Sequence, residues 1–338
     1  MMPVTNSLWR ALIGVPLCCC VASAPLAVAS DDVWRINFEI ENDVLVAEDR
    51  HYTNGLFLSL LAPRDYVPSW IATAARLLPP FTDDPSEVRW GVALGHEMYT
   101  PEDYFRRTLI LDDRPYAGWL FARFELYRDR NRDLSDKIPY LDSFRVSLGV
   151  VGPAAIAKEA QSGIHAVFFS PKFVGWDNQL KNEVGLILRR GRHWRIPGEA
   201  IEIGRGLCVD AIANLTLDLG NVKTAATTGV MLRGGWRLPQ DFGLGRFSPA
   251  EDPDSGMRLY AFIGADISAV VRNIFLDGNT FRDSHSVDKQ VMVIHAPIGI
   301  AFARGGFRTS LSVIWISEEF RGQDGADLSG RWSIGWAY

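Results

Sequence analysis

Apolar and polar residues alternate in short stretches along this chain. In WRINFEI, residues 34–40, every second position from Trp34 is apolar and the positions between are polar. The stretches RWGVALGHEMY (89–99) and GWLFARFELY (118–127) alternate in the same way. Because successive side chains of a strand point to opposite faces, a period of two predicts β-strands. A soluble sandwich alternates as well, but there the apolar face forms a buried core.

The pattern predicts twelve strands, an even number as in bacterial outer membrane barrels. We expect Trp, Tyr and Phe near the strand ends of the apolar face to form an aromatic girdle. The chain ends in RWSIGWAY, an aromatic final strand typical of such barrels. The predicted fold is an all-β, twelve-stranded antiparallel transmembrane β-barrel. Approximate spans are 34–44, 53–62, 87–99, 115–128, 142–152, 181–191, 206–217, 226–237, 257–270, 289–303, 306–318 and 330–338.

Composition agrees with a membrane barrel. The chain has 338 residues, with 11 Trp, 18 Phe and 9 Tyr. No segment beyond residue 30 reaches the ~18 consecutive apolar residues of a spanning helix. The formal net charge of −5 is mild and argues against nucleic acid as a partner. A barrel in which every second strand residue contributes to an apolar outer surface fits these facts.

The first thirty residues read as a secretory signal peptide. Arg10 supplies a positive charge, residues 11–24 are mostly apolar, and Ala27-Val28-Ala29 is a small-x-small cleavage pattern. A membrane anchor would need a longer apolar run. We therefore expect residues 1–30 to be removed and residues 31–338 to form one barrel domain. Only Cys208 then remains, which excludes an internal disulfide and a thiolate metal site.

An even strand number places both termini in the periplasm, so connections after odd-numbered strands face outward. These outward connections are 45–52, 100–114, 153–180, 218–225, 271–288 and 319–329. The connection 63–86 is long for a periplasmic turn, and SWIATAARLL within it predicts a short amphipathic helix at the interface. Residues 154–169 predict a second helix, in an extracellular loop, interrupted at Gly163 and stopped by Pro171.

The tip of the first hairpin gathers oxygen-bearing side chains. Asn42 and Asp43 end the first strand and Thr53 opens the second. An amide oxygen, a carboxylate and a hydroxyl are hard donors that suit Ca²⁺ better than zinc. An Asn-Asp pair is equally common in plain turns, and both interpretations remain open on the residues alone.

Two other outward connections carry candidate residues. Gln161 and His165 are four apart, so they share a face of the predicted helix. A histidine there could act as a general base, although a lone His is more often a packed or surface residue. Arg106 and Arg107 suit phosphate groups, with an ordinary surface charge pair as the alternative. The chain has no G-x-S-x-G nucleophile elbow.

Several short motifs follow one another in the first half of the barrel sequence. They are END (41–43), DRHYTNG (49–55), DRPYAGW (113–119), Gln161, IH (164–165) and GWDNQLKNE (175–183). In order and spacing they resemble the outer membrane lipid A 3′-O-deacylases, twelve-stranded barrels that trim lipopolysaccharide. The second half of the chain matches only in its strand pattern.

The resemblance implies a calcium-dependent esterase that releases the 3′-linked acyl group of lipid A. By this resemblance Asn42, Asp43 and Thr53 form part of the Ca²⁺ site, His165 activates water, and Gln161 helps to orient the histidine. The ion would polarise the ester carbonyl and stabilise the oxyanion.

The resemblance also assigns Arg106 and Arg107 to the lipid A phosphates, with looser spacing. It implies a monomer in the outer membrane of a Gram-negative bacterium, with the active site facing the exterior and lipopolysaccharide as its partner. An outer membrane phospholipase would instead need a Ser–His pair in the wall, which the sequence does not suggest. A non-enzymatic pore or scaffold would need a wide lumen, whereas twelve strands enclose a narrow one.

Overall fold

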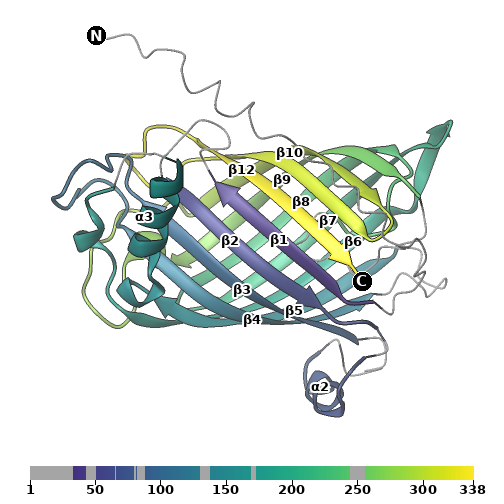
Figure 1. Ribbon diagram of the computed structural model, residues 1–338, viewed down its shortest axis with the longest axis horizontal. Coiled ribbons are helices and arrows are strands. Elements are labelled where there is room, and N and C mark those ends of the chain that lie inside the picture. Colours follow the sequence, from purple (N-terminus) through teal and green to yellow (C-terminus); the bar gives the residue numbers. More distant parts are fainter. Residues whose placement is uncertain are drawn as a thin grey trace, which may run out of the picture.

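The computed structural model of the protein describes residues 33–42, 51–64, 66–79, 81, 88–129, 138–168, 173–243 and 256–338; for residues 51–53 and 164–168 it describes the backbone only. Within these ranges, twelve antiparallel strands close into one barrel, and β1 pairs with both β2 and β12 (Figure 1). This confirms the predicted fold class. The strands are β1 (Arg35–Asn42), β2 (His51–Leu61), β3 (Val88–Thr100), β4 (Ala117–Asp129), β5 (Tyr140–Val151), β6 (Glu183–Gly204), β7 (Leu207–Gly220), β8 (Lys223–Trp236), β9 (Arg258–Asn273), β10 (Met292–Arg304), β11 (Phe307–Ile316) and β12 (Asp327–Ala337).

The predicted alternation places polar residues inside the barrel and apolar residues outside. On β1, Asn37 and Glu39 are buried in the interior, whereas Ile36 and Phe38 are 39% and 40% exposed on the outer wall. A soluble β-protein would bury the apolar face instead. An apolar outer wall around a polar interior is the arrangement of a barrel that spans a lipid bilayer.

On β4 three of the four aromatic residues lie inside, contrary to the expected girdle, and Phe124 packs against Trp70 outside. Trp119, Phe121 and Tyr127 are all at most 3% exposed. Trp119 stacks on Phe121 with ring centroids 4.0 Å apart, and both belong to an apolar cluster with Phe275. The girdle prediction was wrong for this strand because these rings pack on apolar residues of the interior. Elsewhere aromatic side chains do lie on the outer wall, as Trp336 does at 46% exposure.

Strand β6 is much longer than the sequence predicted. It continues to Gly204 instead of ending near residue 191. The stretch RIPG around Pro197 has the composition of a turn. The strand continues through it because irregular pairing between Ile196 and Ile201 absorbs the misfit with β7.

The barrel has two distinct ends. The terminal end holds the start of β1 and the last residues of β12, which pair with each other, as Arg35 does with Ala337. The loop end holds the connections that follow odd-numbered strands. Figure 1 shows α3 (Ala157–Phe168) at the loop end and α2 (Ser69–Ala75) at the terminal end. Both helices were predicted, and α3 runs through Gly163 without interruption.

Helix α2 lies beside the barrel wall. Ile71 and Ala75 are fully buried against Val88 and Leu126, while Trp70 is 65% exposed. The helix therefore has an apolar inner face on the barrel and an aromatic side chain on its outside. An amphipathic helix with this division suits a membrane interface, which remains our expectation for it.

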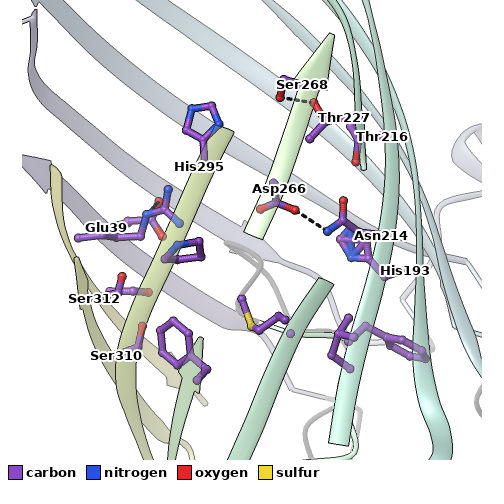
Figure 2. Close-up of a pocket in the computed structure, with 18 of the residues that line it drawn as sticks. Glu39, His193, Asn214, Thr216, Thr227, Asp266, Ser268, His295, Ser310 and Ser312 are labelled. Atoms are coloured by element: carbon purple, nitrogen blue, oxygen red, sulfur yellow. Dashed lines mark hydrogen bonds and ion pairs between the residues drawn. The ribbon is translucent and has the colours of Figure 1, made fainter. Parts of the chain in front are cut away.

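Polar side chains line the middle of the interior. They surround two adjoining cavities of about 320 and 380 Å³. Figure 2 shows the first, in which Asn214 donates to Asp266 at 2.7 Å and the hydroxyls of Thr227 and Ser268 lie 2.8 Å apart. Towards the loop end, the apolar cluster around Phe275 of α4 (Ile274–Asp277) narrows the interior beside the second cavity. This packing disfavours an open pore.

A buried ion cluster lies towards the terminal end. Arg233 of β8 donates two hydrogen bonds to Asp210 of β7, at 2.8 and 2.6 Å. A further hydrogen bond joins it to Asp241, and all three side chains are fully buried. Phe242 beside Asp241 lines the cavity of Figure 2, so this segment turns into the barrel. The arginine thus ties two strands to the segment after β8.

We predict that Arg233→Met destabilises the barrel by about 3–5 kcal/mol, since two buried carboxylates lose their counter-charge. Loss of the compact barrel with temperature, followed by its mobility on semi-native gels, measures the effect. Arg331→Met is the matched control, because the Arg331 side chain is 33% exposed at its ion pair with Glu41. Equal stability of the two variants would contradict a special role for the buried cluster.

Candidate active site

The connection between β5 and β6 covers part of the outer wall. It contains the short helices η3 (Pro153–Ala155) and η4 (Trp176–Asn178) on either side of α3. Helix α3 contacts β3 and β4 from outside, across the wall at the loop end (Figure 1). The contact is close at Gly118, where an added Cβ would lie 2.4 Å from the Cβ of Ala157. A side chain at this position would therefore push α3 away.

Gln161 lies one turn after Ala157 and is 3% exposed. Its Oε1 accepts a hydrogen bond of 2.7 Å from Nε1 of Trp176. An indole nitrogen only donates, so the amide oxygen must face Trp176 and the amide nitrogen must point away. That nitrogen is buried and has no hydrogen-bond partner in the described part of the chain. It is free to donate to a ligand.

Two asparagines lie side by side on the outer wall at the loop end. Asn42, the last residue of β1, pairs in register with Asn54 of β2. Asn54 is 5% exposed, and its Oδ1 has no partner among the described residues. The outward positions further along β2 are apolar, as at Leu58. These amides therefore interrupt an otherwise lipid-facing strip.

The strand pairing is irregular next to this asparagine pair. Tyr52 pairs with Tyr99 and Asn54 with Met98, so Thr53 is the extra residue of a β-bulge. Bulges redirect side chains and are common beside active sites. Met98 is fully buried in the apolar cluster that also contains Ala157 of α3. Asn42, Asn54 and Met98 are therefore register neighbours on β1, β2 and β3, and Met98 packs in one cluster with Ala157 of α3.

The predicted catalytic residues come from the same end of the barrel. Strand order and direction place Asn42, Thr53 and α3 at the loop end. The side chains of Thr53 and His165, and Asp43 as a whole, lie outside the described residues. A contact between His165 and the cluster of Asn42, Asp43 and Thr53 therefore stays a prediction.

Arg106 and Arg107 are both exposed in the connection between β3 and β4. Arg106 Nε donates to Thr108 at 3.1 Å, and the carbonyl of Arg107 accepts from Asn178 Nδ2 at 2.7 Å. The connection therefore packs against η4, close after α3. Their predicted role towards phosphate groups stays a prediction.

Long-range contacts hold the loops of this end together. His285 donates through Nε2 to the carbonyl of Asp113 at 2.7 Å. Arg114, fully buried, forms an ion pair of 2.9 Å with Glu319 and lies 5.3 Å from the ring centroid of Tyr99. Burial alone would raise the pKa of Glu319, but Arg114 stabilises the carboxylate and the pKa is lowered. The connections after β3, β9 and β11 therefore act as one unit.

The described donors fit a hard cation better than a soft one. Within the described ranges, no three His, Cys, Asp or Glu side chains lie close enough together to hold a metal ion. Among the described residues at this part of the wall, the unpartnered Oδ1 of Asn54 is an open amide acceptor. Amide oxygens suit Ca²⁺. The predicted carboxylate of Asp43 would add the negative charge.

Sequence reasoning missed Asn54, His96 and Trp176. His96 faces outward on β3, and its Nε2 is buried with no hydrogen-bond partner among the described residues. Asn54 and His96 are each a polar residue in a run of outward apolar positions. This break in the pattern could have identified them from the sequence. Only the fold shows that the Trp176 indole holds Gln161.

Fold and site together define an outer membrane β-barrel whose outer wall carries buried polar side chains beside a covering helix. The family described as outer membrane protein LpxR matches residues 15–338, and the chain belongs to this family. Among the helices in the described part of the chain, none is long and apolar enough to cross a membrane.

Solved structures are similar in fold. LpxR from Salmonella typhimurium is 20% identical, with a TM-score of 0.69, and the match covers 89% of this chain and 99% of that one. The β domain of the Bordetella autotransporter BrkA is 10% identical over 91% of this chain and 98% of that one, with a TM-score of 0.47 too low to support an argument. Among curated proteins, none matches this chain significantly.

We predict opposite effects for two glycine substitutions near α3. Gly118→Ala introduces the 2.4 Å contact with Ala157 and should loosen α3, so that proteases cut the 152–182 connection faster. Gly163→Ala meets nothing within 4 Å and should leave the cleavage rate unchanged or lower it, because Ala favours the helix. Equal cleavage of both variants would show that α3 does not rest on Gly118.

Proposed function

We propose that this protein is a calcium-dependent lipid A 3′-O-deacylase, an esterase that hydrolyses the ester of the 3′-linked acyl chain. The observation that carries the proposal is the amide nitrogen of Gln161 on α3, which is buried and has no partner among the described residues. The hydrogen bond from Trp176 to the amide oxygen fixes its direction. Membership of the outer membrane LpxR family supports it. Buried polar side chains at a lipid-facing wall suit a substrate that stays in the membrane.

In this proposal the side chains of α3 and of the first hairpin share the chemistry. His165 takes a proton from water, the resulting hydroxide attacks the ester carbonyl, and the proton passes to the departing sugar oxygen. Gln161 orients the histidine or the acyl group through its amide nitrogen. Asn42, Asp43 and Thr53 would hold Ca²⁺, which when bound polarises the carbonyl and stabilises negative charge on its oxygen.

The proposed orientation has the loop end outside the cell. Lipid A lies in the outer leaflet, so its esters would meet the wall at the level of α3. Arg106 and Arg107, exposed in the loop that packs on η4, would face the lipid A phosphates. Residues 1–30 would direct export, and the protein would act as a monomer in the outer membrane of a Gram-negative cell.

We predict that His165→Ala and Asp43→Ala each lower deacylation by at least about 10²-fold while the barrel stays folded, since a general base and a metal ligand are lost. Mass spectra of lipid A from cells that express each variant measure the loss of the acyl chain. Ser162→Ala, on the exposed side of α3, is the control. With purified protein, a calcium chelator should stop the reaction and added Ca²⁺ should restore it. Undiminished acyl loss in His165→Ala would refute the assignment.

A second prediction concerns Trp176. Trp176→Phe keeps an aromatic ring beside Tyr116 but removes the N–H that binds Gln161 Oε1. The freed amide should lower kcat about tenfold with little change in KM, because Gln161 loses its orientation. In the double variant, Trp176→Phe should add no further loss of kcat to the loss that Gln161→Ala causes alone. Additive losses would mean that Trp176 acts independently of Gln161.

A further inference from the structure

The outer wall carries a groove on a side of the barrel away from α3. It crosses β6 to β10 and has a volume of about 620 Å³, whereas α3 packs on β3 and β4. Every outward-facing residue that lines the groove is apolar. Pockets that bind small molecules are also mostly apolar and have volumes of about 300–1,000 Å³. The groove is therefore large enough for part of a lipid.

A row of outward residues forms one rim of the groove. In this row, Ala211 of β7 lies in register between Ile196 of β6 and Leu232 of β8. The row continues through Ile263 of β9 to Ile298 of β10. All of these side chains except that of Ala211 are large and exposed on the outer wall. They stand above the smaller residues of the next row.

The next row forms the floor. In it, Gly234 of β8 lies in register between Val209 of β7 and Ala261 of β9. A Cβ added at Gly234 would have Cγ1 of Val209 as its nearest neighbour, at 3.5 Å, which is an ordinary contact. The φ of Gly234 is not positive either, so the backbone does not require a glycine here. The missing side chain leaves a space that a ligand can fill.

The irregular part of β6 forms the opposite edge. Between the pairs made by Ile196 and Ile201, four residues of β6 face one residue of β7. Pro197, in this excess, and Ile201 are exposed and line the groove. Bulged strands redirect side chains and are common next to functional sites. A bound ligand gives the turn-like residues of β6 a function as the edge of its site.

The groove lies in the half of the wall next to the terminal end. Ile263 is the sixth residue of the 16-residue β9, counted from that end. Trp236, the last residue of β8, follows Gly234 on the outer wall towards the same end and is exposed. Exposed Trp side chains on a membrane protein mark the level of the lipid headgroups. A lipid in the groove would therefore have its headgroup near Trp236.

Two exposed arginines lie at this level. Arg205 is in the turn between β6 and β7, and Arg237 directly follows Trp236. The backbone N–H of Arg237 donates to the carbonyl of Gly206 at 3.0 Å, so the arginines belong to neighbouring segments. The nearby carboxylate of Glu202 accepts from the N–H of Gly206 at 3.1 Å. Guanidinium groups bind phosphate through paired hydrogen bonds, so a phosphate headgroup complements this end of the groove.

We propose that the groove across β6 to β10 binds one acyl chain of a glycerophospholipid, whose phosphate lies near Arg205 and Arg237. The phospholipid belongs to the leaflet next to the terminal end, which is the inner leaflet in the proposed orientation. The site is separate from the candidate active site, so the lipid bound here is not the one that is hydrolysed. It fills the space over Gly234 and supports β6 where the pairing with β7 is irregular.

A photoreactive phospholipid tests this site in the folded protein. The probe is a phosphatidylglycerol with a diazirine in the middle of one acyl chain, added in detergent micelles. A diacylglycerol with the same chain lacks the phosphate. After irradiation, mass spectrometry of peptides locates the adducts. Gly234→Leu and Ala261→Leu each fill the floor, and Ala226→Leu adds the same side chain to β8 outside the groove. Mobility on semi-native gels verifies that each variant is folded.

We expect the wild-type adducts to be concentrated on residues 196–211 and 232–234. Each floor variant should lower the adduct yield about tenfold, the ratio for about two buried methylene groups, while Ala226→Leu leaves the yield unchanged. The diacylglycerol should label the same peptides more weakly, because it has no phosphate for the arginines. Arg205→Gln should narrow this difference between the two probes.

Adducts spread evenly over the outward strands, or a yield that the floor variants do not change, would overturn the inference and show that the wall meets only bulk lipid. Native mass spectrometry of the same samples tests for another occupant. Dimers that Gly234→Leu dissociates would assign the groove to a second copy of the chain and would equally overturn it. Equal labelling by the two probes would refute the phosphate contact and with it the choice of a phospholipid.

Discussion

The packing of α3 on the outer wall is the contact on which the candidate site depends. A barrel wall in a bilayer must be apolar, because unsatisfied polar groups in lipid are costly. Asn54 is a buried polar side chain on this wall, and α3 covers the neighbouring part of β3 and β4. Gly118 allows this cover to approach the wall, and Met98 and Ala157 seal it. Polar chemistry at the level of the lipid therefore requires this close helix–strand contact.

The described interior is tied together by ion pairs and by packed apolar residues. Towards the terminal end, Arg233 bridges two buried carboxylates, and at the loop end Trp119 and Phe275 belong to an apolar cluster. The polar cavities lie between these two packed regions. A barrel filled in this way gives the loop end a rigid base. Ion pairs and hydrogen bonds between the loops, such as Arg114 with Glu319, then hold the cover in place.

A candidate site on the outside of the barrel fits the proposed substrate, a lipid of the membrane. Such a lipid can reach the outer wall beside α3 without leaving the leaflet. A lumen site would require the lipid to enter a space filled with charged side chains. Asn54, His96 and Gln161 each carry a buried unpartnered atom, and none of these residues lines the two interior cavities.

The sequence by itself determined the barrel, because alternation with a period of two records which side chains face lipid and which face the interior. It also predicted α2 and α3 from their composition, and it pointed to the hairpin tip and to α3 as sources of site residues. It could not predict that β6 passes through Pro197, since only pairing with β7 makes that favourable. The inward direction of Trp119 was likewise decided by packing with Phe275. The hydrogen bond from Trp176 to Gln161 and the approach of Ala157 to Gly118 came from tertiary structure alone, because the position of a covering helix is set by contacts between residues far apart in the chain.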